Sequence, residues 1–248
     1  MSKVVLITGG SRGIGAATAL LAARQGYAVA VNYTANSLAA DEVVRLIRAE
    51  GGQAITVQGD VAREADVLAM FEKVDAKFGR LSALVNNAGV VDQTSRVDAM
   101  SASRLQRMFE VNVFGSFLCA REAVKRMSTR YKGSGGCIVN VSSAAAKLGA
   151  PGQYVDYAAA KGAIDTFTVG LAKEVALEGI RVNAVRPGII ETDLHASGGL
   201  PNRAREMAPQ VPMQRAGTAD EVAEAIVWLL SSHSSYTTGT LLDVTGGR

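Results

Sequence analysis

A glycine-rich turn near the start of the chain constrains the fold more than any other feature of the sequence. The apolar run Val4–Ile7 leads into Thr8 and a turn with the spacing Gly-x-x-x-Gly-x-Gly, formed by Gly9, Gly13 and Gly15, and an alanine-rich stretch of helical character follows. This order brings the free N–H groups and the dipole at a helix start close to the strand end, where they favour an anion such as a pyrophosphate. No Gly-Lys-Ser/Thr follows the turn, which excludes a P-loop, and a tight turn without a ligand is the alternative.

Short β-branched runs alternate with helical stretches along the whole chain. Strands are predicted at Val4–Ile7, Ala28–Asn32, Ala54–Gln58, Ala83–Asn86, Cys137–Val141, Arg181–Arg186 and Leu241–Val244. Further helices are predicted at Leu38–Glu50, Glu64–Phe78, Ser103–Arg130, Tyr154–Leu177 and Ala219–Ser231. This alternation is typical of an α/β fold with a doubly wound parallel sheet and helices on both faces. No linker, repeat or low-complexity tract divides the chain, so a single domain over residues 1–248 is expected.

The composition excludes several classes of protein. With 248 residues and 48% hydrophobic content, the chain can bury the core of one α/β domain. A net charge of +3 with dispersed Lys and Arg gives no nucleic-acid footprint, and two cysteines and two histidines in no pattern predict no metal site. No apolar stretch is long enough to span a membrane and the first strand begins near residue 3, so we expect no signal peptide and a cytoplasmic protein.

The segment at about 191–217 breaks the alternation of strands and helices. It contains Gly198, Gly199, three prolines and no clean helical or strand period. Because it follows the carboxyl end of a predicted strand, we expect a substrate lid over a site there. A surface loop without a role in binding is the alternative.

Small, polar or turn-forming residues follow nearly every predicted strand. In an open parallel sheet, ligands bind outside the carboxyl ends of the strands, so these residues are the candidates for a site. They are Thr8–Gly15, Asn32 and Tyr33, Asp60 and Val61, Asn86–Gly89, Ser142 and Ser143, and Pro187 and Gly188. Packing alone does not explain six such positions along one edge of a sheet.

Tyr157 and Lys161 lie four residues apart in a stretch that is predicted to be helical. This spacing places both side chains on one face of the helix, one turn apart. A phenol has a pKa of about 10 in water, and a nearby ammonium group lowers that pKa toward neutral pH, where the phenol becomes an acid–base catalyst. The same spacing also occurs in surface pairs without a catalytic role, so the other motifs of the chain decide its meaning.

Taken together, the motifs resemble those of the short-chain dehydrogenase/reductase family over essentially the whole chain. The residues that carry the resemblance are Thr8, Gly9, Gly13, Gly15, Asp60, Val61, Asn86–Gly89, Asn112, Ser143, Tyr157, Lys161, Pro187, Gly188 and Thr192. Within the family, the chain is similar to the group of 3-oxoacyl-carrier-protein reductases, glucose 1-dehydrogenases and other sugar or alcohol dehydrogenases. The resemblance implies a single Rossmann-type NAD(P)-binding domain that interconverts a carbonyl and an alcohol by hydride transfer.

The resemblance implies four catalytic residues, Asn112, Ser143, Tyr157 and Lys161. Tyr157 is expected to exchange a proton with the substrate oxygen, and Lys161 is expected to lower the pKa of Tyr157 and to bind the nicotinamide ribose. Ser143 is expected to donate a hydrogen bond to the substrate oxygen as charge develops there. Asn112 is expected to kink a helix and to hold a water that links Lys161 to solvent, with a buried, satisfied amide as the alternative.

The choice of Ser143 over Ser142 needs an argument, because the family's serine lies about thirteen residues before the tyrosine and position 144 is an alanine. A one-residue insertion before Tyr157 explains the offset, and the second serine of the pair matches best. Strand alternation sends Ser142 and Ser143 to opposite sides, so only one of them is expected to face the site.

The resemblance also implies a set of cofactor-binding residues. They are Gly9, Ser11, Arg12, Gly13, Ile14, Gly15, Asn32, Tyr33, Thr34, Asp60, Val61, Asn87, Ala88, Gly89, Tyr157, Lys161, Pro187, Gly188, Ile190 and Thr192. NADP(H) is favoured over NAD(H), because no acidic residue ends the second strand and Arg12 offers a positive charge to a 2′-phosphate. Asn32, Tyr33 and Thr34 add neutral donors, and use of NAD(H) stays open.

Two alternatives for the function remain, together with one expectation about assembly. A nicotinamide-binding regulator without chemistry would lack the serine, tyrosine or lysine, and all three are present. Among enzymes, a carrier-protein reductase needs basic residues near the mouth of the site, which Arg126, Arg130 and Lys132 offer and Glu178 opposes, whereas a sugar or alcohol dehydrogenase needs a small-molecule pocket. The resemblance and the surplus apolar positions of two long helices imply a homotetramer.

Overall fold

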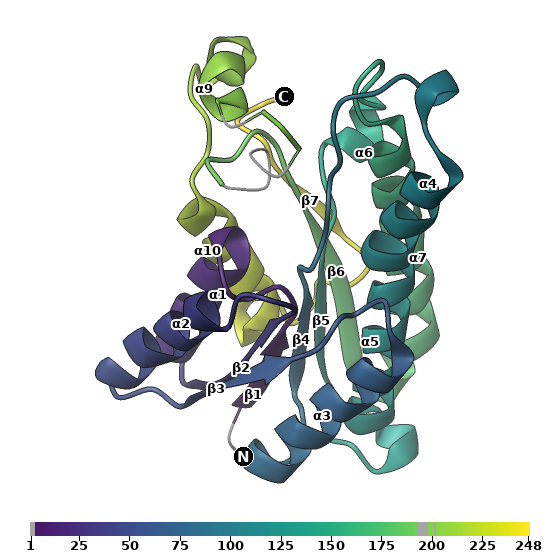
Figure 1. The fold of residues 1–248 in the computed structure, drawn as a ribbon. Coiled ribbons are helices and arrows are strands. Elements are labelled where there is room, and N and C mark those ends of the chain that lie inside the picture. The colour runs from purple at the N-terminus through teal and green to yellow at the C-terminus, as the bar shows by residue number, and fades with distance from the viewer. Residues whose placement is uncertain (1–2, 193–197, 201) are drawn as a thin grey trace.

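Seven parallel strands form one sheet at the centre of the molecule (Figure 1). The computed structural model describes residues 3–192, 198–200 and 202–248. The strands are β1 (Lys3–Ile7), β2 (Tyr27–Tyr33), β3 (Ala54–Gln58), β4 (Ala83–Asn86), β5 (Gly136–Val141), β6 (Ile180–Pro187) and β7 (Leu241–Val244), in the spatial order β3-β2-β1-β4-β5-β6-β7. All seven predicted strands are confirmed: three have the predicted bounds, and the other four differ by one residue at one or both ends.

Strand β1 is buried on both faces of the sheet. Val4, Val5, Leu6 and Ile7 have no exposed surface. Such a continuous apolar run is what a strand needs when helices cover both sides of a parallel sheet. The strand pairs with β2 on one side and with β4 on the other, so the chain reverses its direction of winding at β1. A crevice for a ligand is expected at the carboxyl end of this switch point.

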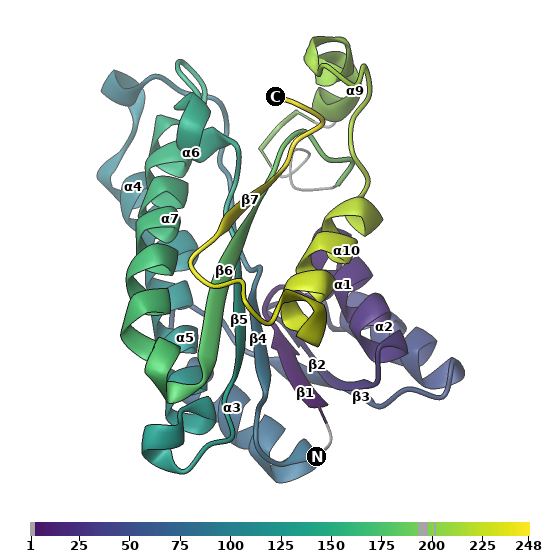
Figure 2. The ribbon, with the colours of Figure 1, turned by 180° about the vertical axis from the view of Figure 1, so that it is seen from behind.

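Two groups of helices cover the sheet, as Figures 1 and 2 show from opposite sides. One face carries α1 (Gly13–Arg24), α2 (Ser37–Ala49) and α10 (Ala219–Leu230). The other face carries α3 (Glu64–Phe78), α4 (Ala102–Phe109), α5 (Gly115–Met127) and α7 (Val155–Val175), with the short α6 (Ala145–Leu148) beside α7. Each group closes its own apolar core against the sheet. None of the described helices is both long and apolar enough to cross a membrane.

The helix predicted at Ser103–Arg130 is divided in the structure. Helices α4 and α5 are separated by a π-helical turn at Glu110–Phe114, in which the Gly115 N–H bonds to the Glu110 carbonyl oxygen. The predicted interruption at Asn112 is therefore confirmed. A second difference lies at the end of α7, where the last predicted turn is a 3-10 turn, Ala176–Glu178.

The segment predicted as a lid has more regular structure than its sequence suggests. It contains α9 (Arg203–Met207) and a 3-10 turn, Ala208–Gln210. Its ends are joined by a parallel bridge between Ile190 and Gly217, with hydrogen bonds of 2.9 Å from Glu191 N to Gly217 O and from Gly217 N to Ile189 O. Residues 193–197 and 201 of this segment lie outside the described residues.

Candidate active site

A cavity of about 910 Å³ opens at the carboxyl ends of the strands. Most of the predicted site residues line it: Gly9, Ser11, Arg12, Gly13, Ile14, Tyr33, Thr34, Asp60, Val61, Asn87, Ala88, Gly89, Ser143, Tyr157, Lys161, Pro187, Gly188, Ile190 and Thr192. Three predicted residues, Gly15, Asn32 and Asn112, do not line it. The fold thus brings one contiguous site together from segments that are far apart in the sequence.

The glycine turn is shaped by close backbone contacts. Gly9 and Gly13 have φ values of +59° and +53°, which L side chains rarely adopt. A Cβ atom at Gly15 would lie 2.4 Å from the Gly9 carbonyl oxygen and 2.6 Å from Asn87 Nδ2. Gly15 therefore lets α1 start against the turn, and its role is packing rather than contact with a ligand.

The start of α1 leaves an anion-binding position in the cavity wall. Arg12 is its N-cap residue, and no side chain caps the first turn in the described part of the chain. The first N–H groups of a helix and its dipole favour a negatively charged group at this place. Arg12 itself is exposed and lines the cavity, and no described carboxylate pairs with it.

Asn32 does not face the cavity, and the prediction that it contacts the cofactor is wrong. Its side chain is buried, and its Oδ1 atom accepts a hydrogen bond of 3.0 Å from the Gly9 N–H. Its Nδ2 group donates to the carbonyl oxygens of Val57, at 3.2 Å, and Gly59, at 3.0 Å. Asn32 thus joins β3 to the glycine turn, and its donors are already used within the protein.

The neighbouring residues Tyr33 and Thr34 do line the cavity, so the end of β2 contributes through them. On the other side of this region, Asp60 pairs with Arg107, with 3.2 Å between Oδ2 and Nη1. Arg107 comes from α4 and also lines the cavity, which the sequence did not predict. Arg107 and Asp60 are far apart in the sequence, so no local sequence pattern identifies Arg107 as a residue of the site.

Lys161 is buried in the wall beside Tyr157. Its Nζ atom donates a hydrogen bond of 2.7 Å to the Val141 carbonyl oxygen and lies 5.5 Å from the centre of the Tyr157 ring. Helix α7 carries both residues, so the predicted one-turn spacing holds in the structure. The ammonium group and the phenol therefore face the same cavity.

The pKa of Tyr157 moves away from neutral pH, and the pKa of Lys161 moves toward it. Burial raises the pKa of Tyr157 to about 12, and the Ser143 hydroxyl opposes that rise through a hydrogen bond. Burial lowers the pKa of Lys161 to about 8, and the negative charge of Asp165 opposes that fall. The net pKa of Tyr157 therefore does not move toward neutral pH, because desolvation of the phenolate is its largest cause. The expected lowering of this pKa by Lys161 stays a prediction.

The two serines after β5 have different surroundings. Ser142 is buried, and its hydroxyl donates a hydrogen bond of 3.2 Å to the Lys161 carbonyl oxygen. Ser143 is half-buried, and its hydroxyl interacts with Tyr157 and accepts a hydrogen bond of 3.1 Å from the Ala145 N–H. Ser143 is therefore the serine placed beside the phenol, and Ser142 supports the helix backbone at Lys161.

Asn112 is fully buried behind the cavity wall. Its Nδ2 group donates to the carbonyl oxygens of Val90 and Met108, at 3.0 Å each, and its Oδ1 atom accepts from the Val90 N–H at 3.2 Å. A Cβ atom at Gly89 would lie 2.8 Å from this Oδ1 and 3.6 Å from Lys161 Nζ. The alternative of a satisfied buried amide thus describes Asn112, which fixes the loop after β4 next to Lys161.

These features together fit a dinucleotide. Gly9 and Gly13 line the cavity without side chains and form a cradle, and the start of α1 offers uncapped N–H groups for a pyrophosphate. Thr8 joins this turn to the loop after β4, because its Oγ1 atom accepts hydrogen bonds of 3.0 Å from the N–H groups of Asn87 and Ala88. A cavity that runs from this cradle to Tyr157 would place a redox-active ring beside the phenol.

Comparison with known proteins decides the family. A family model described as enoyl-(acyl carrier protein) reductase matches residues 9–248. A solved short-chain dehydrogenase/reductase of Serratia marcescens, a double mutant, matches with a TM-score of 0.91 and 31% identity over 100% of this chain and 98% of that one. The chain belongs to the short-chain dehydrogenase/reductase family. It is therefore an oxidoreductase of the kind that acts on CH–OH donors with a nicotinamide cofactor as acceptor.

Named relatives lie at several distances within the short-chain dehydrogenase/reductase family. The uncharacterized oxidoreductase YgfF of Escherichia coli is 57% identical over 245 residues, which is 99% of each chain. A 3-oxoacyl-[acyl-carrier-protein] reductase of Synechocystis is 40% identical over 99% of this chain and 96% of the relative. The corresponding reductase of Staphylococcus aureus is 37% identical over 100% of this chain and 98% of the relative.

The short-chain dehydrogenase/reductase site has further wall residues that the sequence did not assign to it. Gln153, Arg203, Met207, Gln210 and Arg248 line the cavity. Most of them come from segments that lack a regular period, so no sequence pattern places them at the site. Apolar or small residues and one tyrosine also line the cavity: Val90, Val91, Ala144, Leu148, Tyr154 and Ile189.

Proposed function

We propose that this chain is an NADP(H)-dependent oxidoreductase that interconverts a small carbonyl compound and its alcohol, with Tyr157 as the acid–base. The observation that carries this proposal is the placement of Ser143, Tyr157 and Lys161 in the wall of the cavity that also contains the glycine turn. One ligand bound along that cavity would reach from the anion-binding start of α1 to the phenol.

The residues of the chain divide the reaction between them. A bound nicotinamide supplies or accepts the hydride. In reduction, the Tyr157 hydroxyl gives its proton to the substrate oxygen, and the Ser143 hydroxyl donates a hydrogen bond to that oxygen as negative charge builds up. The Lys161 ammonium stabilises the phenolate that results and binds ribose hydroxyls. The Val141 carbonyl and the Ser142 hydroxyl hold Lys161 and its helix turn in place.

The high pKa of Tyr157 in the protein without a cofactor fits this division of work. A phenol with a pKa of about 12 is a protonated acid at neutral pH, as carbonyl reduction requires. The reverse reaction needs the phenolate, which an added positive charge would favour. We propose that the Lys161 ammonium, 5.5 Å from the Tyr157 ring, lowers the pKa of Tyr157 in that direction.

The preference for NADP(H) rests on the end of β2 and the start of α1. Tyr33 and Thr34 line the cavity and carry no negative charge that would repel a 2′-phosphate. Arg12 lies in the same wall and supplies a guanidinium group. Asp60 is the acidic side chain of this region, and its pairing with Arg107 offsets its charge.

A 3-oxoacyl-carrier-protein reductase is the second candidate, because two relatives at 40% and 37% identity carry that name. Arg126, Arg130 and Lys132 were expected to serve its acidic partner, but they precede β5 and so lie at the opposite edge of the sheet from the cavity of their own chain. Arg126 is also paired with Asp75 and Glu122. The expectation that these residues surround the mouth of the site is therefore wrong within one chain. They lie where the parallel strands begin, whereas the cavity lies where the strands end.

The structure of the lid segment supports its proposed role. Arg203, Met207 and Gln210, from α9 and the turn that follows it, line the cavity, so this segment forms part of the wall over the substrate. The bridge between Ile190 and Gly217 anchors both ends of the segment beside the site. We propose that it closes over the substrate and excludes water during turnover.

The oxidation of NADPH in the presence of carbonyl compounds tests the proposed function. The absorbance of the reduced cofactor is followed with a panel of small ketones, aldehydes, sugars and 3-oxoacyl thioesters, the last both free and on a carrier protein. Turnover of a small carbonyl that Tyr157→Phe abolishes supports the proposal. Turnover of carrier-linked thioesters alone would favour the second candidate, and no turnover with either nicotinamide cofactor would reject both.

A further inference from the structure

The substrate end of the cavity carries polar side chains that the reaction does not use. Tyr154 immediately precedes α7, and Tyr157 lies in the first turn of that helix. Gln153 precedes Tyr154 in the chain, Arg203 of α9 lies over the Tyr154 ring, and both line the cavity, as does Arg248. Apolar residues such as Val91, Leu148 and Met207 also line it, so a few polar groups are left to orient a ligand.

The Tyr154 hydroxyl is a buried donor without a partner among the described residues. Only 4% of the residue is exposed, and it lines the cavity. A Cβ atom at Gly198 would lie 3.5 Å from this hydroxyl oxygen, so the described part of the lid passes directly over it. Buried hydroxyl groups are nearly always hydrogen-bonded, and one that faces a cavity is explained by a ligand that accepts from it.

The guanidinium of Arg203 lies over the Tyr154 ring, 5.3 Å from its centre. Its Nη2 atom donates a hydrogen bond of 2.6 Å to Gln153 Oε1, which orients the group. Its Nε atom is buried and has no partner in the described part of the chain, and no described carboxylate pairs with the guanidinium. A positive charge without a described carboxylate partner and a phenolic donor without a described acceptor therefore lie next to each other.

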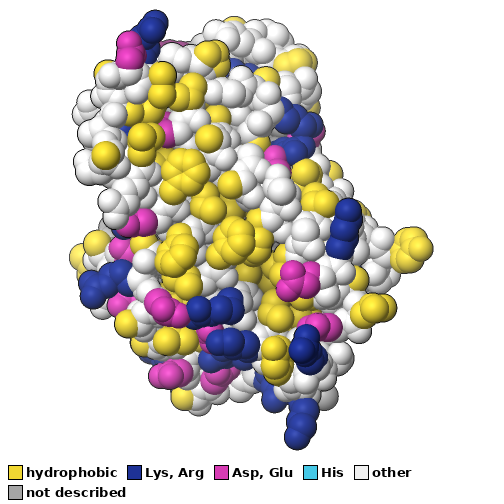
Figure 3. All heavy atoms as spheres, turned by 90° about the vertical axis from the view of Figure 1, so that its right-hand side faces the viewer, with side chains coloured by type: hydrophobic (Ala, Val, Ile, Leu, Met, Phe, Trp, Pro, Cys, Tyr) yellow, Lys and Arg dark blue, Asp and Glu magenta, His cyan; other side chains and the backbone are white. Residues whose placement is uncertain are grey.

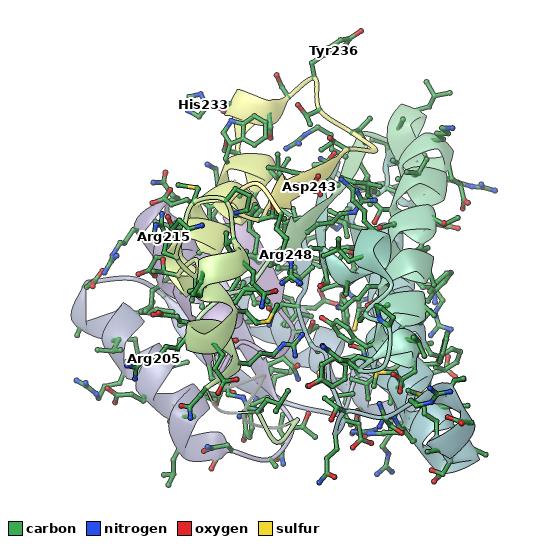
Figure 4. The ribbon with its side chains drawn as sticks, turned by 90° about the horizontal axis from the view of Figure 1, so that it is seen from above. Arg205, Arg215, His233, Tyr236, Asp243 and Arg248 are labelled. Atoms are coloured by element: carbon green, nitrogen blue, oxygen red, sulfur yellow. The ribbon has the colours of Figure 1, made fainter. Side chains whose placement is uncertain are left out.

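The charges of the cavity wall add to this arrangement. Its described basic side chains are Arg12, Arg107, Lys161, Arg203 and Arg248, against the single acidic side chain of Asp60, which Arg107 pairs. In the proposed function, Arg12 binds a cofactor phosphate and Lys161 acts on the Tyr157 phenol, so neither is free to bind the substrate. Seen from above, Arg248 lies between α9 and α10 on one side and α7 on the other (Figure 4).

We propose that the substrate of this enzyme is a small carbonyl compound that carries an anionic group, held by Arg203 and the Tyr154 hydroxyl. This inference rests on the proposed function and names the substrate class of the same site. Because Tyr154 and Tyr157 are three residues apart, one small molecule can present its anionic group to the first and its carbonyl oxygen to the second. A carboxylate and a phosphate share the required chemistry, since both accept from a guanidinium and a phenol.

Matched pairs of substrates, one anionic and one neutral with the same carbonyl group, distinguish the effect of the charge from that of the carbonyl. Acetoacetate is compared with methyl acetoacetate, and dihydroxyacetone phosphate with dihydroxyacetone, by kcat/KM with NADPH. We expect the anionic member of at least one pair to be preferred, and Arg203→Ala to lower kcat/KM for that member about 10- to 100-fold, mainly through KM, with little effect on its neutral partner. The pair that shows the preference identifies carboxylate or phosphate.

Two further variants make the comparison specific. Tyr154→Phe removes only the hydroxyl and should lower kcat/KM for the anionic member about tenfold without changing the neutral one. Arg205→Ala is the matched control, because Arg205 is exposed on the same helix, does not line the cavity and lies on the side of α9 turned away from Arg248 (Figure 4). Its kinetics should equal those of the unmodified enzyme.

Binding without turnover distinguishes failure of this inference from failure of the proposed function. Calorimetry measures the affinity of acetoacetate and of dihydroxyacetone phosphate for the protein saturated with NADP⁺. If no carbonyl is turned over but Arg203→Ala still weakens anion binding tenfold or more relative to Arg205→Ala, the anion site stands and the redox proposal fails. If neutral carbonyls are reduced as well as anionic ones, and Arg203→Ala affects both alike, the anion site is overturned.

Discussion

The Nζ atom of Lys161 donates a 2.7 Å hydrogen bond to the carbonyl oxygen of Val141, the last residue of β5. This contact ties the ammonium group of α7 to the strand that leads into the two serines. Burial at this place lowers the pKa of Lys161 to about 8, with Asp165 as the opposing charge. The site therefore holds a lysine whose charge is costly in the absence of a ligand.

The first prediction concerns the pH dependence of stability. The unfolded chain has a lysine pKa of 10.5 and the folded chain one of about 8, so the unfolded state binds more protons between these values and stability rises with pH across that window. Lys161→Met removes the free-energy cost of burying the charged ammonium. The free energy of unfolding of the variant should therefore exceed that of the unmodified protein by on the order of 3 kcal/mol below pH 8, and this difference should vanish by about pH 10.5. Urea unfolding from pH 7 to 10.5 measures it.

The control for this prediction is Lys73→Met, on the exposed side of α3. Its difference from the unmodified protein should not change with pH over the same range. A difference for Lys161→Met that is equally constant would show that the buried lysine does not titrate as its surroundings indicate.

Tyr157→Phe should lower turnover by ~10²-fold or more, because the substrate oxygen loses its proton donor. Cofactor affinity, measured by fluorescence titration with NADPH, should stay nearly unchanged, since the ring remains in the cavity wall. Turnover near that of the unmodified enzyme would show that another group transfers the proton.

The two serines should differ in the kind of defect that alanine causes. Ser143→Ala should cost about 2–4 kcal/mol of transition-state stabilisation, because it removes the hydroxyl beside Tyr157 that polarises the substrate oxygen. Ser142→Ala should cost much less in catalysis and about 1 kcal/mol in stability, through the lost hydrogen bond to the Lys161 carbonyl. Values of kcat/KM and urea midpoints separate the two effects, and a larger catalytic loss at Ser142 would reverse the assignment.

The parts of the site that the sequence predicted are those set by strand ends and local spacing. Gly9, Tyr157 and Ser143 follow from a turn spacing, a helical period and strand alternation, and each of these is a property of neighbouring residues. Asn32 was misplaced because its partners, Gly9 and Gly59, come from two other segments, and no pattern around Asn32 reveals that they converge on it.

The same limit applies to charged residues whose partners are distant in sequence. Arg107 reaches Asp60 across the gap between α4 and β3, and Arg203 reaches Gln153 from α9. Nothing in their own helices predicts this. The misplacement of Arg130 has a different cause: its place before a predicted parallel strand already puts it at the edge of the sheet away from the site.

Cofactor preference can be tested at Thr34 rather than at Asn32. Thr34 is exposed and lines the cavity, so Thr34→Asp would place a carboxylate against a 2′-phosphate and should weaken NADPH binding about tenfold or more relative to NADH. Asn32→Asp should instead destabilise the fold, because a buried carboxylate would face the carbonyl oxygens of Val57 and Gly59. Titrations with both cofactors decide, and tighter binding of NADH by the unmodified protein would contradict the preference.

The last prediction is a homotetramer, and the structure changes the residues that support it. Some apolar side chains of the predicted helix Ser103–Arg130, such as Met108 and Leu118, are buried within the chain and are not surplus. Others on α4, the π-helical turn and α5 are exposed, namely Leu105, Phe109, Phe114 and Phe117, and Figure 3 shows apolar side chains gathered on this face of the molecule. A contiguous apolar surface of this kind is typical of a protein interface.

A second apolar surface lies near the carboxyl-terminal end of the chain. Tyr236 is fully exposed and extends from the surface (Figure 4), and the edge strand β7 leaves Leu241 and Leu242 half-buried. Two separate surfaces allow two isologous interfaces, and their closure gives a tetramer. Light scattering at micromolar concentration should therefore report four times the chain mass of 25.8 kDa.

Charge substitutions test which surface forms each interface. Phe114→Asp, where 54% of the residue is exposed, should halve the mass to that of a dimer, since a buried unpaired carboxylate is costly at an apolar interface. Leu38→Asp is the control, because Leu38 is also apolar and is 81% exposed but lies on α2, on the opposite face of the sheet. A mass of 25.8 kDa for the unmodified protein would reject oligomerisation, and twice that value would leave one interface.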